Sequence, residues 1–319
     1  MKRFLSLIAV FALLQAGIFV ALVLLSLPPD NLHAAAIDKE RLLKETPSPR
    51  VVLVGGSAMA FGIDSATFAD ALGGDYRIVN MGLHAGLGLD FLLNETLDGL
   101  RKGDVVVISP EYDIVWADRP SHLEIAEVLR FQPSAYRYVE ARHWAPTIRS
   151  AILEQPPVVL HDVAVNALRN QLPALGSGGV YWRSSFNSSG DNRSASELER
   201  TYKPTPEEMA PQSSAADYPQ NLATIREFAM AARERGARVF YAPPPLLDER
   251  YAASREVVDK TVADMQGESG VQVLSTSAAE VFPLEAFFDS GNHLRGEAVY
   301  DRTRRIAEAL RAALRDSPQ

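Results

Sequence analysis

The chain has 319 residues, 47% of them hydrophobic, with a formal net charge of −8 and an isoelectric point near 5.4. Cysteine is absent, which excludes disulfides, thiolate metal sites and a thiol nucleophile. The length and apolar content suffice for one large domain, whereas the acidic balance argues against nucleic acid as a partner.

The first 27 residues predict a membrane helix. Lys2 and Arg3 precede a nearly uninterrupted apolar stretch up to Leu27, long enough to cross a hydrocarbon core of about 30 Å. Basic residues before such a stretch favour a cytoplasmic N-terminus and an exported remainder. We expect residues 1–27 to be an uncleaved signal anchor in the inner (cytoplasmic) membrane, with a periplasmic C-terminal domain. A signal peptide cleaved near residues 33–36 is the alternative.

Residues 28–49 are polar and proline-flanked, and they predict a tether between the membrane helix and the domain. From residue 50 onward, short apolar runs alternate with helical patterns. The expected strands are 50–56, 76–82, 104–112, 238–245 and 271–275, and the expected helices are 64–74, 89–103, 218–237, 252–268 and 297–314. Residues 50–319 should therefore form a three-layer α/β/α domain around a mostly parallel five-stranded sheet.

Residues 115–215, between the third and fourth expected strands, have a different composition. Helical patterns continue to about residue 171, and a stretch rich in Gly, Ser, Asn and Pro follows. We interpret the first part as a helical cap insertion and the second as a long surface loop.

Two short motifs at opposite ends of the domain predict nucleophilic chemistry. The first strand ends on Gly55 and Gly56 and is followed at once by Ser57, while Asp289 precedes His293 by four positions just before the last helix. Imidazole can accept a serine proton only when it is neutral and oriented, and a carboxylate on its other nitrogen provides both. Each motif alone is more often a turn or helix cap, but their order at the two ends of an α/β chain favours a Ser57–His293–Asp289 triad.

These motifs resemble those of the SGNH hydrolases, also called the GDSL superfamily, over residues 50–112 and 218–314. "GGSAMAFGID" resembles the nucleophile block, "NMGLHAG" the oxyanion block with Gly82 as amide donor, and "DSGNHL" the Asp-His block lengthened by one residue. The resemblance implies a flavodoxin-like fold, an acyl-serine intermediate, and no cofactor or metal.

The third block departs from the family pattern, because "SPEYD" stands where the family has Gly-x-Asn-Asp. The family asparagine donates to the oxyanion, and an ionised Glu111 cannot do so. Tyr112, Asn80 or Asn292 could donate instead, or Glu111 could bind the acceptor or fix a loop, or activity could be weak. Membrane-tethered members that acylate exported polysaccharides, such as the alginate O-acetylation proteins and the teichoic-acid D-alanylation protein, also depart from the simple hydrolase pattern.

Other residues admit a structural as well as a functional explanation. His84 follows Gly82 closely and could line the site or act as a cap. Tyr181 and the three tryptophans could stack on sugar rings or pack in the core. Glu111 and Asp113 lack a third ligand nearby in the sequence, which argues against a metal site.

We therefore expect an extracytoplasmic, membrane-anchored serine esterase or acyltransferase that transfers acetyl to, or removes it from, an exported polysaccharide. Its expected partners are the polysaccharide or a small acyl ester, the inner membrane and a membrane-bound acyltransferase. A non-catalytic binding or assembly subunit on a degenerate hydrolase fold is the main alternative. A lipase-like esterase is a third, and it predicts an apolar cap groove within residues 123–172.

Overall fold

The computed structural model describes residues 1–25, 30–171, 179–192, 198–215 and 218–316. Its α-helices are α1 (Lys2–Leu25), α2 (Ala35–Glu45), α3 (Ser57–Phe61), α4 (Ser65–Leu72), α5 (Leu89–Gly99), α6 (Tyr112–Trp116), α7 (His122–Phe131), α8 (Ala141–Leu153), α9 (Gln155–Gln171), α10 (Pro206–Met209), α11 (Tyr218–Glu234), α12 (Asp248–Gly267) and α13 (Glu297–Asp316). The 3₁₀ helices are η1 (Leu32–Ala34), η2 (Ala85–Leu87), η3 (Pro133–Tyr138), η5 (Arg183–Ser185), η7 (Ser277–Glu280) and η8 (Leu284–Ala286). The strands are β1 (Arg50–Val54), β2 (Arg77–Asn80), β3 (Val105–Ile108), β4 (Arg238–Tyr241), β5 (Leu246–Leu247), β6 (Gln272–Val273) and β7 (Val281–Phe282).

The five main strands form one parallel sheet in the order β2-β1-β3-β4-β6. The predicted α/β fold with a five-stranded parallel sheet is confirmed. The remaining strands, β5 and β7, pair with each other in a separate parallel ladder that the sequence did not predict. Because parallel strands end at the same edge of the sheet, the turns after β1, β2, β3 and β4 lie together there.

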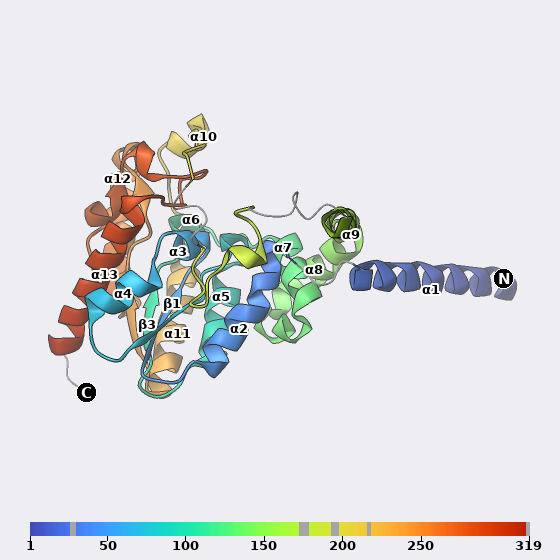
Figure 1. Ribbon diagram of the computed structural model, residues 1–319, viewed down its shortest axis with the longest axis horizontal. Coiled ribbons are helices and arrows are strands. Elements are labelled where there is room, and N and C mark those ends of the chain that lie inside the picture. The colour runs from blue at the N-terminus through green and yellow to red at the C-terminus, as the bar shows by residue number, and fades with distance from the viewer. Residues whose placement is uncertain (26–29, 172–178, 193–197, 216–217, 317–319) are drawn as a thin grey trace.

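Helices cover both faces of this sheet (Figure 1). In β1, Val51 and Leu53 pack in the core cluster that includes side chains of α4 and α13. The alternating residues Val52 and Val54 pack in the opposite cluster, with side chains of α5 and α11. A strand buried on both faces needs apolar residues at every position, which is why β1 and β3 were readable as continuous apolar runs.

Part of the segment that we expected to be a tether is folded, over residues 32–45. This segment forms η1 and α2, and α2 packs against α5 and β2. Its buried residues Ala35, Lys39 and Leu43 recur every four positions and share one helix face. This buried face could not be recognised in the sequence, because prolines flank the segment and one of the three residues is a lysine.

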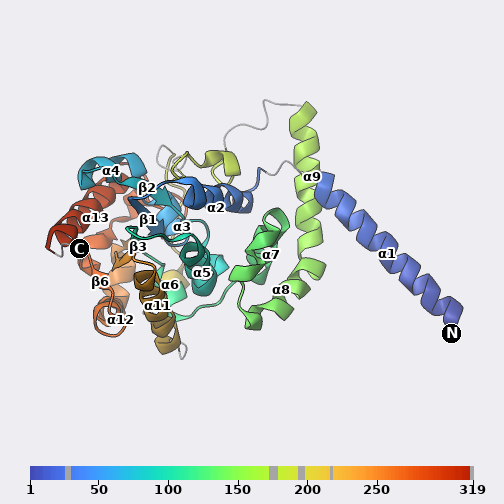
Figure 2. The same cartoon turned by 90° about the horizontal axis from the view of Figure 1, so that it is seen from below.

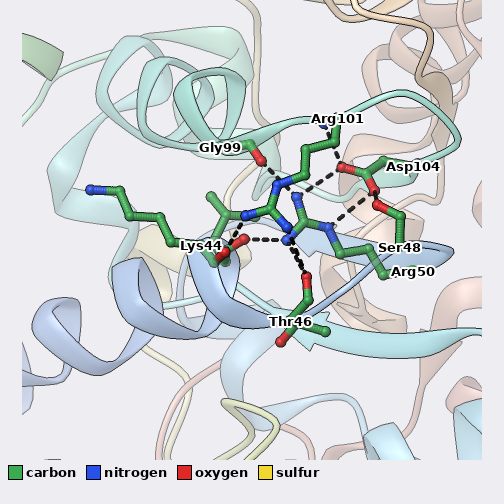
Figure 3. Close-up of polar contacts among 8 residues, drawn as sticks. Lys44, Thr46, Ser48, Arg50, Gly99, Arg101 and Asp104 are labelled. Atoms are coloured by element: carbon green, nitrogen blue, oxygen red, sulfur yellow. Dashed lines mark hydrogen bonds and ion pairs between the residues drawn. The ribbon is translucent and has the colours of Figure 1, made fainter.

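A buried ion pair fastens the end of α2 to the sheet (Figure 3). Arg50 and Asp104 are both fully buried, and Arg50 Nη2 lies 2.9 Å from Asp104 Oδ2. Arg50 also donates to backbone carbonyls at the ends of α2 and α5, namely those of Leu43, Thr46 and Gly99. Removing one partner of such a pair typically costs about 3–5 kcal/mol, so the N-terminal segment is an integral part of the domain.

The insertion contains the helices α7, α8 and α9, which pack on one another, and α9 also contacts α1 (Figure 2). The predicted surface loop is only partly on the surface. Asp191 and Asn192 are buried, and the Asp191 carboxylate accepts hydrogen bonds from the side chains of Ser65 and Asn80. The rest of that loop at 172–178 and 193–197 lies outside the described residues.

Helix α1 is apolar and exposed along its length. Its segment Lys2–Leu22 has a mean hydropathy of 2.5, and none of its most apolar stretch is buried inside the protein. Such a helix is consistent with a signal anchor or a signal sequence and could hold the protein to a membrane. The last two residues of the predicted anchor, 26 and 27, lie outside the described residues.

Candidate active site

Ser57 is the first residue of α3, directly after the carboxyl end of β1. The two glycines before it are required by close contacts. A Cβ on Gly55 would lie 2.6 Å from the Ser109 carbonyl oxygen, and a Cβ on Gly56 would lie 2.6 Å from both carboxylate oxygens of Glu111. Only glycine allows this approach, and it leaves Ser57 half-buried at the edge of the sheet.

Glu111 lies under the Ser57 turn and holds it from both sides. Its Oε2 accepts from the Gly56 amide at 3.1 Å, and its Oε1 accepts from the Ala58 amide at 2.8 Å. Burial raises the pKa of the Glu111 carboxyl, although the amide hydrogen bonds and the nearby His293 act in the opposite direction. Among the roles considered for Glu111, loop fixing is the one that these hydrogen bonds describe.

Asp289 and His293 form a hydrogen-bonded pair in the loop before α13. His293 Nδ1 lies 2.7 Å from Asp289 Oδ1, and His293 is 6% exposed. The Tyr181 hydroxyl donates to the other oxygen of Asp289 and lies 3.3 Å from His293 Nδ1. Burial acts to raise the pKa of Asp289, but the hydrogen bonds from His293 and Tyr181 outweigh it and lower that pKa. The carboxylate therefore stays ionised and leaves His293 Nε2 as the free ring nitrogen of the pair.

The His293 ring stacks on Phe61 of α3, with centroids 4.1 Å apart and planes inclined by 16°. Phe61 follows Ser57 by four positions, so both side chains lie on one face of the helix. Within the described residues no hydrogen bond joins Ser57 to His293. The stacking on Phe61 places His293 against the helix that begins with Ser57.

The predicted oxyanion residues are placed differently from the expectation. The Gly82 amide donates to Asn80 Oδ1 at 2.9 Å, so this N–H is already used within its own loop. The Asn80 side-chain amide donates to the Met59 carbonyl and to Asp191, which occupies its donors as well. Tyr112 is buried in the core, stacked on Trp116. These residues shape the structure around α3. The Asn292 side chain, also considered from the sequence, and the Ser57 backbone amide remain as candidate donors to an oxyanion.

His84 acts as a cap, one of the two roles considered for it. Its Nδ1 accepts from the Gly86 amide at 3.0 Å at the start of η2, and burial lowers its pKa. His84 also lies within 4.8 Å of ligand atoms of His33 and Glu124, a donor set that could hold a metal ion. A neutral His84 whose Nδ1 accepts a hydrogen bond carries its proton on Nε2, however, and that nitrogen then cannot bind a cation.

A hollow of about 790 Å³ lies elsewhere. It is lined by residues of α2 and of the segment 183–190, including Asp38, Arg183 and Phe186. Neither Ser57 nor His293 lines it. We assign the candidate site from the Ser57, His293 and Asp289 side chains, because the volume of a hollow does not by itself mark a reaction centre.

No protein-family model matches the chain, and no curated protein matches it. The findings establish an α/β protein with a five-stranded parallel sheet and an N-terminal apolar helix, and they identify no family.

Sequence reasoning missed two residues of the site, Phe61 and Tyr181. The position of Phe61 four residues after Ser57 is a signal that could have been read. Tyr181 lies in the insertion, far from every motif, and was considered only for sugar stacking or core packing.

Proposed function

We propose that the protein is a membrane-anchored serine esterase or O-acyltransferase that acts through an acyl-serine intermediate. Ser57 is the nucleophile and His293 is the general base. Asp289 orients the His293 ring and balances the positive charge that forms on it. One observation carries this proposal: the Asp289–His293 pair packs, through Phe61, on the helix that begins with Ser57.

The reaction steps use the Ser57 hydroxyl and the His293 nitrogen that does not contact Asp289. Ser57 Oγ would attack the ester carbonyl and pass its proton to His293 Nε2, since Nδ1 is engaged with Asp289. The C–O bond of the ester then breaks, and the leaving alcohol takes that proton. In the second step a polysaccharide hydroxyl or water attacks the acyl-serine, His293 accepts its proton, and Ser57 is regenerated.

In this scheme the Glu111 carboxylate lies beneath the turn and faces the charge that develops on His293. Attraction between the two groups is one of the effects that act to lower the Glu111 pKa, against the larger effect of burial. The same charge disfavours an oxyanion nearby. We therefore assign Glu111 to holding the turn and to charge balance, and assign the oxyanion to the Ser57 amide.

The N-terminal helix and the family resemblance are the basis for proposing an exported polysaccharide as the acceptor of the acyl group. Helix α1 would hold the domain at the outer surface of the inner membrane, where exported polysaccharides and a membrane-bound acyltransferase would be within reach. Acetyl is the proposed acyl group. Esterase and transferase share every residue up to the second step, so both reactions use the same site.

Fluorophosphonate labelling of the full chain in detergent tests the proposal. These probes react with activated serines, and we expect labelling of the wild type that is lost in both Ser57→Ala and His293→Ala. Equal labelling of wild type and Ser57→Ala would contradict it.

A non-catalytic binding subunit is the second candidate. The engaged Gly82 amide and the glutamate at position 111 favour it, because they remove two oxyanion donors of the family pattern. It predicts no labelling of the wild type under any condition that preserves the fold.

A further inference from the structure

Helix α8 carries its apolar residues on the outside. Trp144, Ile148 and Ile152 recur every four positions, and with Leu153 they are between 40% and 65% exposed. The buried side of the same helix presents Thr147 and Ser150 instead. A helix in water shows the opposite arrangement, so the face formed by Trp144, Ile148, Ile152 and Leu153, here called the α8 apolar face, requires a cover.

The neighbouring helix connects this face to the membrane helix. Helix α9 packs on α8 and also on α1 (Figure 2), and it exposes Leu160 and Leu168. Helix α1 has the length and hydropathy of a membrane span, so with α1 in a bilayer the helices packed beside it would lie near the bilayer surface. Lipid is then the nearest cover for the α8 apolar face.

Charge and shape at the α8 apolar face also suit a lipid surface. Arg149 is exposed on the same helix, whereas Arg142, also exposed, is ion-paired with Asp90 and Glu140. Amphipathic helices that lie in a membrane interface combine Trp and aliphatic residues with basic ones. A hollow of about 250 Å³ opens beside this face, lined by Leu129, Val139 and Trp144 among others. It would admit apolar groups from an adjacent layer.

We propose that α8, together with the exposed side of α9, lies on the bilayer surface with the α8 apolar face inserted among the lipids. This proposal rests on the membrane anchorage by α1 that the proposed function includes. It adds a second attachment, which holds the domain in one orientation on the membrane instead of letting it swing on α1.

The absence of cysteine makes the test direct, because single cysteines can be labelled without removing native ones. Ile148→Cys in full-length protein is labelled with an environment-sensitive NBD fluorophore and reconstituted into phosphatidylcholine–phosphatidylglycerol vesicles. Ala312→Cys on α13 is the matched control, since Ala312 is exposed and α13 lies at the end of the molecule away from α1 in Figures 1 and 2. Leu13→Cys, exposed in α1, reports on the anchor itself.

We expect the labels at 13 and 148 to emit at shorter wavelength than the label at 312 and to be quenched by nitroxide groups on the lipid acyl chains. A water-like, unquenched label at 148 together with a quenched label at 13 overturns the docking of α8 and leaves the anchor standing. Water-like signals at both positions overturn the anchor and the docking together. Circular dichroism of each labelled variant verifies that the fold is retained.

Discussion

His293 stacks on Phe61, and this contact joins the loop before the last helix to the first helix after β1. The ring is held from its other edge by Asp289, so both its plane and its tautomer are fixed by neighbours. Because Phe61 and Ser57 share one short helix, any shift of α3 moves the nucleophile and the surface that supports the base together.

Phe61→Leu should separate positioning from folding. Leucine retains most of the buried apolar volume but offers no flat surface to the imidazole. We expect kcat for ester hydrolysis to fall by up to about 10²-fold, the loss that misplacement of a catalytic group by about 1 Å can cause, with KM unchanged. The melting temperature of the variant is the control, and an unchanged kcat would show that the stacking has no role in catalysis.

Tyr181→Phe removes one hydrogen bond to the Asp289 carboxylate. A hydrogen bond to a charged group contributes about 1.5–3 kcal/mol, so a loss in kcat of roughly tenfold or more is expected from a less firmly held Asp289. The ring remains near Phe61, whose centroid lies 5.8 Å away, so the loss of stability should not exceed the contribution of that hydrogen bond. Stopped-flow or steady-state hydrolysis of an activated acetyl ester measures the effect. Wild-type kcat in this variant would place Tyr181 outside the mechanism.

Glu111→Gln should weaken the Ser57 turn. The carboxylate accepts from two amides, whereas a glutamine has one acceptor oxygen and would turn its NH₂ group toward the second amide. Leaving a buried donor unpaired costs about 1–3 kcal/mol, so both the melting temperature and fluorophosphonate labelling should decrease. Increased labelling with unchanged stability would instead mean that the charge of Glu111 only repels the oxyanion.

Two buried groups should give stability an unusual dependence on pH. Burial raises the pKa of Glu95 from 4.5 to about 8 and lowers that of Lys39 from 10.5 to about 7. Between pH 4.5 and 8 the folded state holds the Glu95 proton that the unfolded chain releases, so the free energy of unfolding falls as pH rises. Between pH 7 and 10.5 the unfolded chain holds the Lys39 proton that the folded state lacks, so stability rises with pH.

Glu95→Gln tests this assignment. We measure the melting temperature of this variant from pH 5 to pH 10. The decrease in stability with rising pH that the wild type shows below pH 8 should disappear, and the increase above pH 7 should remain. Lys39→Met should lose the rise, and it should also be less stable throughout because Lys39 donates to the Asn80 and Gly190 carbonyls. Parallel curves for wild type and Glu95→Gln would contradict the shifted pKa of Glu95.

The centre of the sheet could be predicted because β1 and β3 are buried on both faces and therefore read as apolar runs such as Val105–Ile108. Ser57, Asp289 and His293 could be proposed because they adjoin recognisable strand ends and helix starts. The contact between Tyr181 and Asp289 could not, since it joins distant segments and depends on the path of the insertion. The burial of Lys39 was equally hidden, because sequence patterns treat lysine as a surface residue although backbone carbonyls can satisfy its charge.

The site of covalent modification tests the central claim most directly. Full-length protein is treated with the fluorophosphonate, digested and mapped by mass spectrometry, alongside His293→Ala and Ser57→Ala. We expect one adduct, on Ser57, in the wild type, with labelling reduced by several orders of magnitude in His293→Ala because the triad acts as a unit. An adduct on another residue, or equal labelling of Ser57 in the presence and absence of His293, would exclude Ser57 as a nucleophile activated by His293.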